Sequence, residues 1–254
     1  MAIGKQQSGK KGGKKGKKKV IEAMARKEWY DVVAPANFKT RQFAKTICNK
    51  TIGNNIAADN LRGRVYEANL GDLNQSNDRD EPYRKIKFCV QDVQGRNLLT
   101  QFHGMDLTMD RVRCMLKKWC TTIETTIDAK TKDGYEMRLF VIGFSTKNKN
   151  QVSKNCYANM RLVRAVRYRM NKIVKNRIAQ QDITKAVNDL THDVISDLLF
   201  KRCNPLLPLR DVKIRKIKML RTPRVDREEL LKNHGEIPES KEGVVAEVEV
   251  AETA

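Results

Sequence analysis

Two β-hairpins place the strongest constraint on what this chain can fold into. Residues 83–104, YRKIKFCVQDVQGRNLLTQFHG, alternate apolar and polar side chains, and the Gln-Gly pair at 94–95 suits a turn. Residues 125–145, TTIDAKTKDGYEMRLFVIGFS, carry Asp-Gly at 133–134, a dipeptide that tight hairpin turns prefer. Because the two strands of a hairpin run antiparallel, we expect a sheet with mostly antiparallel pairing.

Four shorter segments add strands to these hairpins. They are EWYDVVAP (28–35), FAKTICNKTIG (43–53), GRVYEANLGDL (63–73) and DVKIRKIKML (211–220). In the third segment, Tyr66, Ala68 and Leu70 share one side, so this side can be buried. In the fourth segment, the apolar phase shifts between Ile214 and Ile217, which indicates a β-bulge.

Three amphipathic segments predict helices between the strands. The first begins near Thr108, the second spans about residues 158–178, and the third begins at Asp182, a good N-cap, and ends at NPLLP. Each segment has an apolar stripe at helical spacing. The stripe of the first is Met109, Val112, Leu116, Trp119 and Ile123. That of the second is Leu162, Val166, Met170, Ile173 and Val174, and that of the third is Ile183, Val187, Leu190, Val194 and Leu198. Strands and helices do not alternate as βαβ units. We therefore predict an α+β fold with about three packed helices in one globular domain, residues 20–225.

The charge of the chain is large and unevenly distributed. The 254 residues carry a net charge of +21, and residues 1–19 hold eight lysines and no acid. Residues 20–225 contain 40 bases against 21 acids, so the expected globular domain is itself strongly basic. Residues 226–254 reverse the sign, with nine acids and three bases, and are expected to form a flexible acidic tail. A field of this kind attracts polyanions.

Nucleic acid is the polyanion that the sequence favours, in a soluble intracellular protein. No apolar run reaches the roughly 18–20 residues of a membrane span, and the basic start lacks the aromatic anchors of a membrane-surface helix. Residues 1–19 are too polar to form a core, so we expect a disordered tail that becomes ordered on RNA phosphates. The alternative is a solvated tail that only aids solubility. The tail residues expected to bind RNA are Lys10, Lys11, Lys14, Lys15, Lys17, Lys18 and Lys19.

The second predicted helix offers an RNA contact on a folded element. It has seven bases, and no acid occurs from residue 159 to residue 181. On an ideal helix, four of these bases lie opposite the apolar stripe, so the core does not need them. We expect these four to contact phosphates, with a merely solvated face as the alternative; they are Arg161, Arg164, Lys172 and Lys175.

Residues 102–120, FHGMDLTMDRVRCMLKKWC, gather side chains of the types found in catalytic and metal sites. Cys114 and Cys120 are six residues apart, which places them about 120° apart around a helix. Two zinc ligands on a helix need a spacing near three or four. No motif places a histidine beside either cysteine as a base, and the chain has no phosphate-cradling glycine loop. We therefore interpret this stretch as architecture, and predict no enzyme activity, no metal site and no cofactor.

Ordered motifs along the chain resemble one ribosomal protein family. Residues 61–73, LRGRVYEANLGDL, resemble the signature of the eukaryotic and archaeal small-subunit ribosomal protein family S-three-a, or S-one-e. The resemblance covers about residues 10–235 and includes the lysine-glycine tail. Further motifs that fit the family, in the same order, are EWYDVVAPANF (28–38), DVQGRN (92–97), FHGMDLT (102–108), KKW (117–119), DGY (133–135), RLF (138–140) and KMLRTPR (218–224).

The resemblance implies a structural constituent of the small ribosomal subunit, on the platform near the messenger RNA exit, with a β-rich, barrel-like core. The implied partners are small-subunit ribosomal RNA, neighbouring ribosomal proteins and, near the exit, messenger RNA and initiation factors. The implied location is the cytoplasmic ribosome, after nuclear and nucleolar assembly. Within the signature, Arg62 and Arg64 are expected to contact RNA.

Two other classes of protein share the basic charge. The first alternative is a nonribosomal RNA- or DNA-binding protein, such as an RNA chaperone or a chromatin protein, which need not share the ordered motifs. The second is a metal-dependent nuclease, which the sequence disfavours because it shows no clustered carboxylates on adjacent strands.

Overall fold

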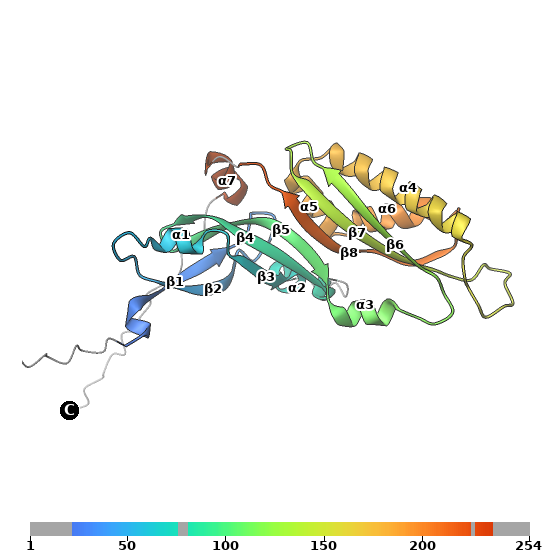
Figure 1. Cartoon of the computed structure of the whole chain (residues 1–254), viewed down its shortest axis with the longest axis horizontal. Helices are drawn as coiled ribbons and strands as arrows, with labels where there is room; N and C mark the ends of the chain where they lie inside the picture. The colour runs from blue at the N-terminus through green and yellow to red at the C-terminus, as the bar shows by residue number, and fades with distance from the viewer. Residues whose placement is uncertain (1–21, 76–80, 225–226, 236–254) are drawn as a thin grey trace, which may run out of the picture.

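A computed structural model of the chain describes residues 22–75, 81–224 and 227–235 and shows an elongated molecule (Figure 1). Its strands are β1 (Lys27–Val33), β2 (Gln42–Asn49), β3 (Val65–Asn69), β4 (Arg84–Gln94), β5 (Asn97–Leu107), β6 (Thr122–Lys130), β7 (Glu136–Ser145) and β8 (Leu209–Arg221). Its α-helices are α1 (Ala57–Leu61), α2 (Leu70–Asn74), α3 (Met109–Met115), α4 (Met160–Ala179), α5 (Ile183–Thr191), α6 (Val194–Cys203) and α7 (Arg227–His234).

Strand β5 is the branch point of the sheet. One of its edges pairs with β4, and β3 pairs with β4 in turn. The other edge is divided, because β1 runs parallel to residues 97–99 while β8 runs antiparallel to residues 104–106. Beyond β8 lie β7 and β6, and beyond β1 lies β2. Across the described residues, β2, β3 and β6 each pair on one side, so the sheet stays open and the expected barrel-like closure is not found.

Both predicted hairpins are confirmed. β4 pairs antiparallel with β5, and β6 with β7. At their tips, Gly95 and Gly134 have φ angles of 58° and 86°, a region that glycine enters without steric cost. The predicted bulge in β8 is also confirmed, because the register of β7 against β8 skips Arg215. Local patterning therefore identified most strands, whereas the parallel pairing of β1 with β5 had no local signal.

Gly104 allows β5 and β8 to approach each other closely. It pairs with Lys87 of β4 on one side and with Lys218 of β8 on the other. A Cβ at this position would lie 2.7 Å from the Ile217 carbonyl oxygen. Because that oxygen belongs to the backbone, the two strands themselves would have to separate. Glycine is thus required where the two halves of the sheet meet.

We expect Gly104→Ala to lower the free energy of unfolding by about 1–3 kcal/mol, as overpacking of a close contact does. Urea denaturation followed by circular dichroism measures this change. Gly143→Ala is the matched control, since its Cβ would meet the end of the Val212 side chain at 3.3 Å, which can shift. Equal stability of the two variants would contradict a special role for Gly104.

Helices α4, α5 and α6 cover one face of β6, β7 and β8 (Figure 1). The inward side chains of α4 follow helical spacing and are buried; they are Val163, Val166, Met170, Val174 and Ile178. They share a continuous core with Leu139 and Val141 of β7 and with Phe88 and Phe102 of the first hairpin. A second core, which includes Leu61, packs α1 against β1, β2, β4 and β5. The sequence prediction for α4 is confirmed to within two residues at each end. In its stripe, Val163 is buried in place of Leu162, Ile178 is added, and Ile173 is only partly buried.

The other two predicted helices differ from the expectation. α3 begins where predicted but ends at Met115, because Leu116 is already extended; Leu116 and Trp119 are therefore exposed instead of packed inward. The third helix is split into α5 and α6, because Asp193 adopts a left-handed φ of 58°. The break rotates α6, so that Ile195 is buried in place of Val194. With the short α1 and α2, the described chain contains seven α-helices where about three were expected.

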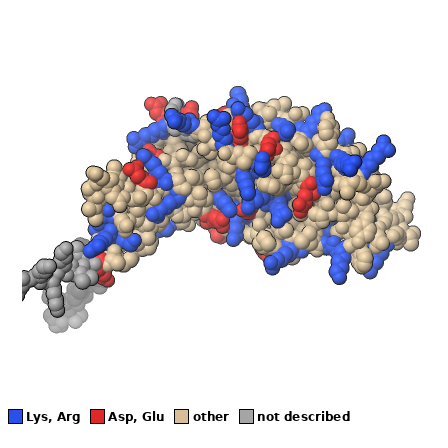
Figure 2. All heavy atoms as spheres, viewed as in Figure 1, with Lys and Arg blue, Asp and Glu red and all other residues tan. Residues whose placement is uncertain are grey.

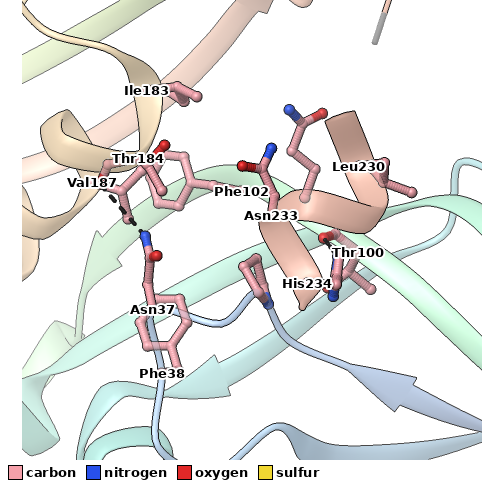
Figure 3. A pocket seen from close by; sticks show the side chains of 12 residues that line it. Asn37, Phe38, Thr100, Phe102, Ile183, Thr184, Val187, Leu230, Asn233 and His234 are labelled. Carbon is pink, nitrogen blue, oxygen red and sulfur yellow. Dashed lines mark hydrogen bonds between the residues drawn. The ribbon is translucent and has the colours of Figure 1, made fainter. Parts of the chain in front are cut away.

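Part of the expected acidic tail is folded against the domain. α7 lies within residues 226–254, and its Leu230 and His234 are buried. His234 donates from Nε2 to the Thr100 carbonyl oxygen at 2.7 Å, and Arg41 donates to the His234 carbonyl oxygen. Figure 3 shows α7 seated beside Thr100 and above a hollow that α5 lines from the other side. The described fold therefore extends to residue 235, and residues 236–254 lie outside the described part.

We expect the buried His234 to lower the free energy of unfolding in mild acid. Burial first, and then the nearby Arg41 cation, lower the pKa of His234 below its ordinary value of 6.5. The unfolded chain therefore binds the proton more readily, so the free energy of unfolding should fall as the pH drops below about 6.5. Urea denaturation at pH about 7.5 and about 5.5 measures this. The variant His234→Gln should lose less stability between these two pH values; an equal loss would place the titration elsewhere.

Candidate nucleic-acid interface

The outer face of α4 is basic, as predicted. Asn159 caps the helix, accepting a hydrogen bond from Arg161 N at 3.1 Å through its side chain. The buried stripe holds the opposite side on the sheet, so the direction of the outer face is fixed. All four predicted residues on this face are exposed: Arg161, Arg164, Lys172 and Lys175. Tyr168 lies among them on the helical wheel and is 72 % exposed.

These four cations are not neutralised by the described part of the chain. None of them lies within ion-pair distance of a carboxylate there. Arg138 first, and Lys175 to a smaller extent, lower the pKa of Asp128, so Lys175 feels that carboxylate at longer range. Unneutralised cations on a rigid helix repel one another, and a row of phosphates would relieve this repulsion.

A groove continues this face toward α6. It has a volume of about 450 Å³ and is lined by Lys172 together with Arg169, Arg177 and Arg202, which the sequence did not suggest. Arg169 donates to the Arg202 carbonyl oxygen at 3.1 Å, and this contact holds the two helices together at the groove. Arg177 is paired with Asp189 at 2.8 Å, so its charge is partly compensated. The groove forms only when α4 and α6 pack, which explains why no sequence pattern predicted it.

Arg62 and Arg64 make contacts within the protein. Arg62 lies 2.8 Å from Asp92, which raises the pKa of its guanidinium. Arg64 donates to the Ile47 carbonyl oxygen at 3.0 Å and so connects the start of β3 to β2. Both arginines thus have a structural role, and their expected RNA contact stays a prediction. Lys10, Lys11, Lys14, Lys15, Lys17, Lys18 and Lys19 lie outside the described residues.

A second basic hollow lies near the start of β1. It has a volume of about 450 Å³ and is lined by Trp29 with Lys27, Lys50 and Arg96. Trp29 is 57 % exposed, although tryptophan side chains are highly buried on average. Figure 2 shows that Lys and Arg spread along the whole visible face of the molecule, with fewer Asp and Glu between them. The basic charge is therefore not confined to α4.

The stretch 102–120 shows no catalytic or metal-binding arrangement within the described residues. It forms the end of β5, α3 and an exposed loop. In the described residues, no group of three or more His, Cys, Asp and Glu side chains is close enough to hold a metal ion. Burial raises the pKa of the Cys89 and Cys203 thiols, which makes them poor nucleophiles. The hollow in Figure 3 measures about 40 Å³, far below the roughly 300 Å³ at which ligand pockets begin.

No helix in the described ranges is long and apolar enough to cross a membrane.

The sequence of this chain is similar to known proteins over nearly its whole length. The Ribosomal S3Ae family matches residues 15–223. The small ribosomal subunit protein eS1B of Trypanosoma cruzi (strain CL Brener) is 59 % identical over 254 residues, which cover 100 % of this chain and 97 % of that protein. The small ribosomal subunit protein eS1 of Periplaneta americana is 47 % identical over 237 residues, 93 % of this chain and 90 % of that protein. The eS1 protein of Spodoptera frugiperda is 46 % identical over 244 residues, 96 % of this chain and 92 % of that protein.

Proposed function

Since this chain belongs to the Ribosomal S3Ae family, we propose that it is a structural constituent of the small ribosomal subunit. The observation that carries the proposal is the 59 % identity, over the whole chain, to a protein named for that subunit. The basic, uncompensated face of α4 supports it independently, because ribosomal RNA is recognised mainly by its shape and its phosphates. The work of such a protein is structural and not enzymatic.

The proposal includes the binding surface. Arg161, Arg164, Lys172 and Lys175 contact phosphates of small-subunit ribosomal RNA, and the groove between α4 and α6 extends this contact. Residues 1–19 form a basic tail that threads between phosphates beyond the reach of the folded domain. Arg62 and Arg64 also contact RNA, from positions that Arg62 fixes by its ion pair with Asp92 of β4 and Arg64 by its hydrogen bond to Ile47 of β2. Residues 236–254 act as an acidic extension.

The finer placement rests on the family resemblance. We place the chain on the platform of the subunit, near the messenger RNA exit, beside neighbouring ribosomal proteins and within reach of messenger RNA and initiation factors. Its working location is the cytoplasmic ribosome, after assembly in the nucleolus. The rival assignment, a nonribosomal RNA-binding protein or RNA chaperone, has no support among the relatives described above.

Sedimentation of cell extracts through a sucrose gradient tests the proposal. The protein should be present at one copy per small subunit and should remain there after a high-salt wash. A known small-subunit protein in the same fractions gives the stoichiometric control. If the salt wash releases the protein completely, or if it sediments only with free RNA, the proposed function is wrong.

A further inference from the structure

We propose that the loop around Trp119 is a binding platform for an unpaired RNA nucleotide, in addition to the phosphate contacts of α4. The inference rests on the proposed function, since it supposes an RNA partner. Trp119 is 48 % exposed, and the nearby Tyr157 is 63 % exposed. Exposed aromatic rings beside basic side chains are the usual means by which proteins hold single-stranded bases.

The backbone holds Trp119 in this exposed place. Its φ is 67°, a left-handed conformation that a bulky side chain rarely adopts and that is concentrated at functional sites. The Trp119 carbonyl oxygen accepts a hydrogen bond from Cys156 N at 2.8 Å, and Ala158 N donates to Thr121 Oγ1 at 3.0 Å. The loop after α3 is thus fastened to the loop before α4, and the ring is presented on a fixed support.

The charge around the ring matches RNA. The ammonium group of Lys154 lies 5.8 Å from the centroid of the Trp119 ring, and Lys117 and Lys118 precede the ring in sequence. Residues 111–123 and 146–158 together carry seven bases and no acid. A protein partner would be expected to meet an interface core depleted of charge, whereas a nucleotide needs both a stacking surface and cations for its phosphate. Figure 1 places both loops at the end of the molecule where α4 begins.

The two binding surfaces therefore divide the work of RNA recognition. The α4 face binds phosphates of the RNA backbone, while Trp119 and Tyr157 stack on a base that is not paired in an RNA duplex. When a base stacks on Trp119, the ammonium group of Lys154 moves from the ring to the phosphate of that nucleotide. Such a base is available in loops and bulges of ribosomal RNA, not inside a duplex.

Tryptophan fluorescence can test the platform directly, because the chain has two tryptophans and Trp29→Phe leaves Trp119 as the one tryptophan. The probes are single-stranded oligoadenylate of about 12 nucleotides, an RNA duplex of the same length, and heparin as a polyanion without bases. We expect strong quenching by the single strand and little by heparin. Trp119→Leu should weaken binding of the single strand roughly 10-fold, with the duplex affinity and the dependence on salt unchanged. Leu116→Ala, an exposed neighbour without a ring, should bind as the unmodified protein does.

The outcomes separate this inference from the proposed function. If heparin quenches as strongly as the single strand, or if Trp119→Leu binds the single strand normally, the platform is wrong. If that variant binds RNA normally but is lost from small subunits after the salt wash, a neighbouring protein covers the ring, and the RNA platform is likewise wrong. In both cases the proposed function stands, because sedimentation of the unmodified protein with small subunits tests it separately.

Discussion

Replacing Arg161, Arg164, Lys172 and Lys175 with glutamine should reduce the slope of log K against log salt concentration by about 3, measured with fragments of small-subunit ribosomal RNA. Each lost phosphate contact removes roughly 0.7–0.9 of slope, because fewer counterions are released on binding. Affinity at low salt should fall with the slope. Stability should change by less than about 0.5 kcal/mol, since all four side chains are exposed and none lies in an ion pair within the described structure.

A matched variant removes the same charge elsewhere. Three of its four bases are exposed, Arg138 is partly exposed, and each lies within 4.0 Å of a carboxylate of the chain itself. The variant changes Lys45, Lys130, Arg138 and Arg215 to glutamine. It should keep the slope within about 1 of the original, because these bases already have partners. If the α4 variant stays folded and keeps its full slope, the face is merely solvated and the RNA is held elsewhere. If both variants lose slope equally, only net charge matters.

Asp193→Asn should destabilise the fold by about 3–5 kcal/mol, the cost of removing one partner from a buried ion pair. Asp193 binds Arg84, whose side chain is 4 % exposed, and lies 2.6 Å from Nζ of Lys213. Arg84 also donates to the Thr191 carbonyl oxygen. Without the carboxylate, the guanidinium of Arg84 would remain buried and uncompensated. This cluster joins β4, the α5–α6 junction and β8, so its loss weakens contacts between distant segments.

Asparagine is chosen because it tolerates the left-handed φ of 58° that Asp193 adopts, so the variant isolates the charge. Asp128→Asn is the matched control. Asp128 holds Arg138 at 2.6 Å in an exposed pair, which should contribute less than about 1 kcal/mol. Urea denaturation of both variants decides the matter. A loss below about 1 kcal/mol for Asp193→Asn would show that water replaces the carboxylate.

Features with a local periodic signal were predictable from the sequence. Both hairpins and the bulge at Arg215 follow from the two-residue alternation of apolar and polar side chains in strands. The two faces of α4 follow from the spacing of three and four residues in a helix. The exposure of Arg161, Arg164, Lys172 and Lys175 followed for the same reason. Their contact with RNA stays a prediction.

The remaining features depend on contacts between distant segments. The apolar spacing through Leu116 and Trp119 imitates a longer helix, but the chain leaves the helix after Met115 to reach β6. Asp193 breaks the third helix because it pairs with Arg84, 109 residues away. The groove between α4 and α6 and the seat of α7 likewise require tertiary packing. No window of sequence holds that information.

The divided edge of β5 affects how the protein folds while it is being synthesised. Gly104 pairs with Lys218, so the two halves of the sheet are joined by residues more than a hundred positions apart. While the chain is being made, β5 and β7 present unpaired edges until β8, which begins at Leu209, has emerged. Unpaired edges bind other strands readily, and pairing across long sequence distance is slow. The nascent protein is therefore most prone to aggregate after β7 has emerged and before β8 joins the two halves of the sheet.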